Sequence, residues 1–103
     1  MALVLIADDE ARIRRLVADF LRRDGHTILE AEDGVAALEL VEAHRAELGL
    51  VILDVMMPRM DGFGVLSAIR ANDQGAPLPV MMLTARAEDT DELYGLEAGA
   101  DDY

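Results

Sequence analysis

Short apolar segments alternate with amphipathic segments four times along this chain, and this alternation restricts the fold more than any other feature. An apolar run without a polar interruption is typical of a strand that helices cover on both faces. Strands that alternate with helices imply a parallel α/β sheet with right-handed crossovers. The predicted strands are Ala2–Ala7, His26–Ala31, Leu50–Asp54 and Val80–Leu83, and the predicted helices are residues 10–23, Val35–His44, Phe63–Ala71 and Glu88–Ala98. We expect the second strand, the weakest of the four, at an edge of the sheet.

The first predicted helix has one apolar face and one basic face. Its apolar side chains recur at the spacing of a helix turn, at Ile13, Leu16, Val17, Phe20 and Leu21. Arginines occupy much of the other face, at Arg14, Arg15, Arg22 and Arg23. The apolar face is therefore expected to cover one side of the sheet.

Length and charge exclude several classes of protein. The 103 residues suffice for one domain, which we expect to span residues 1–103. The net charge of −12 argues against direct contact with nucleic acid, which requires a basic surface. No apolar run is long enough to cross a membrane, no signal peptide precedes the first strand, and cysteine is absent. These features predict a cytoplasmic domain that lacks disulfides and thiolate metal sites.

Polar side chains follow three of the predicted strands. Asp8 and Asp9 end the first, Asp54 ends the third and Thr84 follows the fourth. The carboxyl ends of parallel strands share one edge of the sheet, where open α/β folds place their chemistry. Three carboxylates at this edge would repel one another and raise a pKa unless a cation neutralised them. Oxygen ligands without histidine or cysteine favour Mg²⁺ over Zn²⁺.

Each of these residues also has a purely structural explanation. Asp9 precedes a helix and is equally well explained as its N-cap, and Thr84 as a turn or cap residue. Packing explains the methionine cluster that follows Asp54. His26 and His44 are expected at the surface or at a strand edge. The convergence of three strand ends is what favours a functional site.

Four segments of the chain resemble the receiver domain of two-component response regulators. They are Asp8-Asp9, Asp54–Gly62 (DVMMPRMDG), Leu83–Arg86 (LTAR) and Gly99–Tyr103 (GADDY). The last two look most like the winged-helix, DNA-binding branch of that family. The resemblance implies a flavodoxin-like, doubly wound parallel sheet with strand order 2-1-3-4-5.

The resemblance also implies a chemistry for the acidic residues. Asp54 would accept a phosphoryl group from a phosphohistidine on a sensor histidine kinase. Asp9, Asp54 and the backbone carbonyl of Met56 would hold Mg²⁺, with Asp8 binding it directly or through water. Such a domain assists its own phosphorylation and dephosphorylation and is not a turnover enzyme.

The resemblance further implies a switch. Thr84 would donate a hydrogen bond to the phosphoryl group, and Tyr103 would turn inward into the space that Thr84 leaves. The surface near the fourth helix would change, and in the parent protein this change would regulate transcription.

The chain departs from the family pattern at its end. The family places a lysine three residues beyond Tyr103, but this chain ends at Tyr103 and contains no lysine. We therefore interpret it as a truncated receiver with strand order 2-1-3-4, in which the fifth strand and fifth helix are missing. We expect it to bind Mg²⁺ and to respond poorly to phosphorylation. An uncovered apolar sheet face beside the first helix, or the helix-4 side, is expected to drive self-association.

Three other functions are compatible with parts of the sequence. A pseudo-receiver would act as a protein-interaction module without phosphotransfer, as the absence of lysine permits. A Mg²⁺-dependent phosphatase would pair the nucleophilic Asp54 with an acid two residues later, where this chain has Met56. A flavin site would need a Ser-, Thr- or Gly-rich phosphate loop after the first strand, and none is present.

Overall fold

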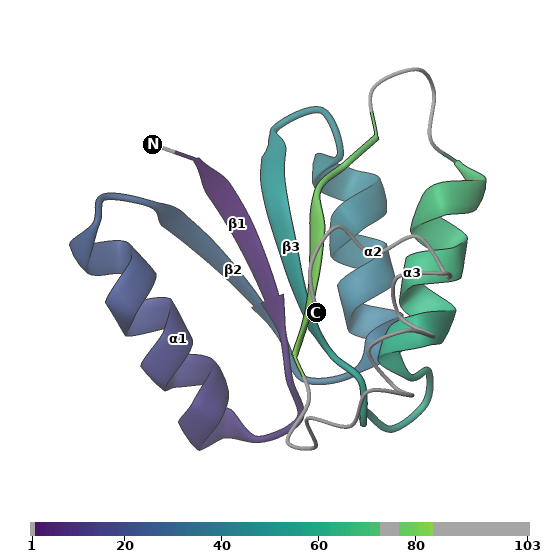
Figure 1. Cartoon of the computed structure of the whole chain (residues 1–103), viewed down its shortest axis with the longest axis horizontal. Coiled ribbons are helices and arrows are strands. Elements are labelled where there is room, and N and C mark those ends of the chain that lie inside the picture. The colour runs from purple at the N-terminus through teal and green to yellow at the C-terminus, as the bar shows by residue number, and fades with distance from the viewer. Residues whose placement is uncertain (1, 73–76, 84–103) are drawn as a thin grey trace.

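The computed structural model describes residues 2–72 and 77–83, which form a parallel sheet with helices on both faces (Figure 1). The elements are β1 (Leu3–Ala7), α1 (Ala11–Arg23), β2 (Thr27–Ala31), α2 (Gly34–His44), β3 (Leu48–Asp54), α3 (Gly62–Ala71) and β4 (Val80–Leu83). The strands follow the order β2-β1-β3-β4, and all neighbouring pairs are parallel. This order confirms the predicted flavodoxin-like sheet, with β2 at an edge. The helix predicted at Glu88–Ala98 lies outside the described residues.

The sheet separates two apolar cores. Helix α1 lies on one face, and α2 and α3 lie together on the other (Figure 1). Alternate residues of β1 serve the two sides: Leu5 and Ala7 belong to the core beneath α2 and α3, whereas Val4 and Ile6 belong to the core beneath α1. Because both faces are covered, β1 carries an uninterrupted apolar sequence.

Strand β3 begins earlier than the sequence pattern predicted, at Leu48 instead of Leu50. Leu3 of β1 pairs with Leu48 and the next residue, Val4, pairs with Leu50, so Gly49 is an extra residue in β3. This irregularity is a bulge, and glycine is common at such positions although it weakens the strand signal in a sequence. The apolar run that begins at Leu50 is only the regular part of the strand.

The helices on the α2–α3 side begin at aspartate caps. The Asp33 Oδ1 atom accepts a 2.8 Å hydrogen bond from the amide of Ala36, and Asp61 Oδ1 accepts one of the same length from Gly64. Each carboxylate pairs an amide of the first helical turn that has no partner within the helix. The loop before α2 therefore ends at Asp33, and the loop before α3 ends at Asp61.

Helix α1 covers its face of the sheet incompletely. Val17 and Leu21 pack against the sheet, but Ile13, Leu16 and Phe20 are 41%, 69% and 66% exposed. The predicted apolar face is thus divided into a buried edge and a solvent-facing edge. None of the helices in the described part of the chain combines the length and the apolar character needed to cross a bilayer.

Candidate phosphoacceptor and metal site

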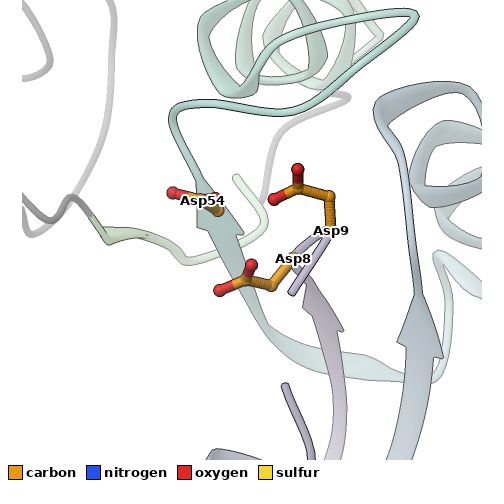
Figure 2. Close-up of side chains that lie close together, drawn as sticks. All are labelled: Asp8, Asp9 and Asp54. Atoms are coloured by element: carbon orange, nitrogen blue, oxygen red, sulfur yellow. The ribbon is translucent and has the colours of Figure 1, made fainter. Parts of the chain in front are cut away.

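The acidic residues meet at the carboxyl edge of the sheet because β1 and β3 are neighbours. Ala7, the last residue of β1, pairs with Leu53, so Asp8 follows β1 at the level where Asp54 ends β3. Figure 2 shows the side chains of Asp8, Asp9 and Asp54 grouped around these two strand ends. Each offers a carboxylate oxygen, and these three oxygens lie within 4.8 Å of one another. The structure therefore brings together the three carboxylates that the strand ends predicted.

Asp8 is held from several directions. The residue is only 5% exposed, and its amide donates a 3.1 Å hydrogen bond to the carbonyl of Ala31 at the end of β2. Its Oδ1 atom accepts a 2.9 Å hydrogen bond from the amide of Glu10, and its carbonyl oxygen accepts one of 2.8 Å from Arg14. The turn between β1 and α1 is thus held by hydrogen bonds to β2 and to α1.

Glu10 occupies the N-cap position of α1, with no hydrogen bond from its side chain to the helix. The alternative in which Asp9 serves as this N-cap is therefore not what the structure shows. Asp9 is exposed and contributes a carboxylate oxygen to the acidic cluster instead.

Asp54 has the one clearly perturbed pKa among the described residues. Burial, followed by the charges of Asp8 and Asp9, raises the pKa of Asp54 from 3.8 to about 6. The amide of Met56 donates a 3.4 Å hydrogen bond to Asp54 Oδ1 and acts in the opposite direction. The carboxylate is thus ionised at neutral pH at a cost to the folded state.

The cluster fits a hard divalent cation. Its donors are carboxylate oxygens, the ligands that Mg²⁺ prefers. Burial is the main cause of the raised Asp54 pKa, and a bound cation would offset the repulsion from Asp8 and Asp9 that adds to it. Met56, whose backbone carbonyl is the predicted additional ligand, lies two residues after Asp54 and is 73% exposed. That carbonyl ligand remains a prediction.

The loop from Asp54 to α3 packs closely on its surroundings. A Cβ atom placed on Gly34, the first residue of α2, would overlap the carbonyl oxygen of Met60. A Cβ atom on Gly62 would overlap the carbonyl oxygen of Asp54. Glycine at these two positions lets the backbone of the loop lie against α2 and against the end of β3.

An ion pair holds the same loop from outside. Arg59 adopts a left-handed backbone conformation with φ of 69°, and its Nη1 atom lies 3.3 Å from Oδ2 of Asp33. Asp33 is buried and uses its other carboxylate oxygen to cap α2. One side chain therefore serves both the helix and the loop.

Several predicted residues do not belong to the described site. Thr84 and Tyr103 lie outside the described residues. Among the methionines, Met57 is buried as packing predicted, whereas Met56 is exposed. His26 accepts a 3.1 Å hydrogen bond from the amide of Ala2, and His44 lies 3.2 Å from Glu47, both remote from the acidic cluster.

Sequence reasoning missed Arg14, which it assigned to the basic outer face of the first helix. Its side chain is 14% exposed and reaches the carbonyl of Asp8 and the carboxylate of Glu30. The available signal was its position in the first turn of a helix that begins two residues after the acidic pair. A helical pattern gives the face of an arginine but not the direction of its long side chain.

Comparison with known proteins identifies the class of domain that this fold and site define. The family model of the response regulator receiver domain matches residues 4–103, and the chain belongs to this family. It is 48% identical over 100 residues to the probable transcriptional regulator ycf27 of Galdieria sulphuraria, and 44% identical to the transcriptional regulatory protein SrrA of Staphylococcus aureus. Each alignment covers 97% of this chain but only 37% and 39% of the relative. The chain thus spans less than two fifths of the length of these relatives.

Solved structures agree with this assignment. The receiver domain of the Francisella response regulator 1452 superposes with a TM-score of 0.90 at 31% identity, covering all of this chain and 82% of that one. A chain of the CheX-CheY-BeF3-Mg+2 complex of Borrelia burgdorferi superposes with a TM-score of 0.89 at 31% identity, covering 97% of this chain and 74% of that one. Both likenesses support the receiver fold.

Proposed function

We propose that Asp54 is the phosphoacceptor of this receiver domain and that Mg²⁺ is held by Asp8, Asp9, Asp54 and the carbonyl of Met56. The observation that carries the proposal is the cluster of three carboxylates at the ends of β1 and β3, with its raised Asp54 pKa. A receiver solved with Mg²⁺ and BeF3 among the structural neighbours supports the choice of metal.

The proposed donor is a phosphohistidine on a sensor histidine kinase. An ionised Oδ atom of Asp54 attacks the phosphorus, a new O–P bond forms, and the P–N bond to the imidazole breaks. The imidazole keeps the bonding pair and takes up a proton from solvent. Bound Mg²⁺ supplies positive charge to the phosphoryl oxygens during this in-line transfer. Hydrolysis of the acyl phosphate by water, assisted by the same site, would return Asp54 to its carboxylate.

The chain's own residues prepare this step. The raised pKa of Asp54 still leaves the carboxylate mainly ionised at pH 7.5, and burial together with the charges of Asp8 and Asp9 makes it a stronger base than an ordinary aspartate. Glycine at position 62 allows α3 to begin against the backbone at the end of β3, next to Asp54.

The response to phosphorylation is proposed to run through Thr84 and Tyr103. The Thr84 hydroxyl would donate a hydrogen bond to the phosphoryl group, and Tyr103 would occupy the space that Thr84 vacates. In the parent protein, we propose that this change regulates transcription, as the names of the similar regulators suggest, and we place that protein in the cytoplasm. The receiver segment itself, with a net charge of −12, would not contact nucleic acid.

Self-association is a further part of the proposal. Leu16 and Phe20 expose large apolar side chains on α1, next to a sheet face that carries Leu50 and Met81. A second copy would cover this surface, with the helix-4 side as the other possible contact. Light scattering at increasing concentration should show a rising mass that Phe20→Glu abolishes, whereas a constant monomer mass of the unsubstituted chain would contradict this contact.

Phosphorylation is tested by incubating the chain with acetyl phosphate and Mg²⁺ and measuring its intact mass. We expect one added phosphoryl group on the unsubstituted chain and on the control Asp61→Asn, whose asparagine still caps α3. Asp54→Asn, or chelation of the metal, should abolish labelling. Labelling of Asp54→Asn would refute the assignment of the phosphoacceptor. Comparing the 103-residue chain with any longer product of its gene tests the expected weak response.

A further inference from the structure

Arg14 connects the acidic turn to two other elements. It lies in the first turn of α1, and its Nη1 atom donates a 2.8 Å hydrogen bond to the carbonyl oxygen of Asp8. Its Nε atom lies 3.1 Å from Oε1 of Glu30 in β2. Glu30 is in turn 3.3 Å from Arg22, in the last turn of α1. The Arg14 side chain is 14% exposed, so its two contacts are shielded from bulk water.

The bond to Asp8 acts on a peptide group that the metal site depends on. The carbonyl of Asp8 belongs to the peptide unit that joins Asp8 to Asp9, and this unit is planar. Fixing its oxygen therefore fixes the plane from which the backbone of Asp9 continues. The amide of Asp8 is already bound to Ala31, so the peptide units on both sides of Asp8 are anchored.

The geometry of the guanidinium makes this anchor directional. Arginine presents its donors in a rigid planar fork, so a guanidinium held by Glu30 through Nε leaves Nη1 little freedom. Glu30 thereby orients Arg14, and Arg14 orients the Asp8–Asp9 peptide.

We infer that Arg14 is a positioning residue for the divalent-cation site: it holds the Asp8–Asp9 peptide so that the carboxylate of Asp9 meets those of Asp8 and Asp54. The inference rests on the proposed function, in which these carboxylates bind Mg²⁺. Arg14 itself donates to a backbone oxygen and takes no part as a ligand.

Electrostatics and positioning make opposite predictions for this residue. The positive charge of Arg14 opposes the approach of a cation, so removing the charge alone would tighten Mg²⁺ binding. Loss of positioning would weaken binding, because groups that orient metal ligands typically change affinity by about 10- to 100-fold. The sign of the change in affinity therefore separates the two effects.

The test compares Arg14→Gln with Arg22→Gln in the full chain, using the Mg²⁺ dissociation constant from titration calorimetry at pH 7.5. The substitutions remove the same charge from the same helix, and both remove a partner of Glu30. Only Arg14→Gln also removes the bond to Asp8. We expect the dissociation constant to rise about 10-fold in Arg14→Gln. In Arg22→Gln it should stay within about 2-fold, because the ion pairs of Arg22 are exposed to solvent and contribute little.

Several outcomes would overturn the inference. Binding by Arg14→Gln that is unchanged or tighter would show that charge alone matters. An equal loss in Arg22→Gln would show that the pairing of α1 with β2, and not the hydrogen bond from Arg14 to the carbonyl of Asp8, sets the affinity. Backbone amide NMR spectra of the metal-free variants supply an independent readout: the Asp9 and Glu10 resonances should move in Arg14→Gln and stay in Arg22→Gln.

Arg14→Lys keeps the inference testable if Arg14→Gln does not fold. A lysine ammonium retains the charge and can reach one partner, but it lacks the planar fork. We expect an affinity between those of the unsubstituted chain and Arg14→Gln, and an affinity equal to the unsubstituted chain would overturn the role of the fork. An unsubstituted chain that bound no Mg²⁺ would refute the proposed function. If the unsubstituted chain bound Mg²⁺ and the Arg14 variants bound it with the same affinity, only the positioning role would be refuted.

Discussion

Substituting Asp54 by asparagine should stabilise the metal-free protein at neutral pH. The pKa of Asp54 rises from 3.8 to about 6 on folding, so the folded state prefers the protonated carboxyl. Between these pH values the native state binds more protons than the unfolded state, and the free energy of unfolding falls as the pH rises. The contribution is fully present below about pH 4 and is lost above pH 6.

The size of the effect follows from the change in pKa. At about 1.4 kcal/mol per pKa unit, ionising Asp54 at pH 7.5 costs the folded state at most ~3 kcal/mol. Asp54 is only partly buried, and screening by solvent reduces this cost to roughly 1–2 kcal/mol. Asp54→Asn removes the charge and retains an oxygen that can accept from Met56, so it should raise the free energy of unfolding by that amount.

The measurement is urea unfolding at pH 7.5 and at pH 4 in the presence of a chelator. Asp54→Asn should be more stable than the unsubstituted chain at pH 7.5 and equal to it at pH 4. The exposed Asp19→Asn, with the same change in charge, should alter stability by less than about 0.5 kcal/mol at either pH. A destabilised Asp54→Asn, or a gain independent of pH, would refute the argument that burial and the neighbouring carboxylates make the ionised Asp54 costly to the folded state.

Three further predictions concern the metal and the loop around it. Because Mg²⁺ must displace a proton from Asp54 below pH 6, its affinity should be constant above about pH 7 and fall up to ~10-fold per pH unit below pH 6; a flat calorimetric profile from pH 5 to 7.5 would contradict this. Gly34→Ala should cost about 1–3 kcal/mol in urea unfolding because its Cβ overlaps the Met60 carbonyl, whereas the Cβ of Gly64→Ala meets side-chain atoms of Met60 and Asp61 and should cost less; equal costs would be inconsistent with the close approach. Asp33→Ala should lose about 1–2 kcal/mol and Asp33→Asn much less, since asparagine also caps helices; equal losses in the two variants would argue against the cap.

Much of the fold was predictable because the burial of each strand and helix in the fold determines which of its positions are apolar. A strand buried on both faces must be apolar at successive positions, and this rule located β1, β3 and β4. The positions of Asp8 and Asp54 followed because a parallel sheet gathers its carboxyl ends at one edge. The order of the strands came from the family resemblance, since periodicity does not say which strands are neighbours.

The details that the sequence did not predict depend on contacts between distant segments. The bulge at Gly49 exists only relative to the register of β1. The left-handed backbone of Arg59 and its ion pair with Asp33 depend on how the loop after β3 meets α2. The inward reach of Arg14 depends on Glu30, a residue of another strand. Local patterns contain none of these relations.

The two faces of the sheet are covered unequally, and this affects which segments of the molecule unfold locally first. The core beneath α2 and α3 contains most of the fully buried large side chains, whereas Ala18 is the single buried residue that α1 contributes. The amides of α1 should therefore exchange with solvent through local openings well before those of β1 and β3. Because Arg14 is part of α1, each such opening would release the Asp8–Asp9 peptide. A bound cation should in turn slow exchange along α1, which would make this exposed helix a reporter of the state of the acidic site.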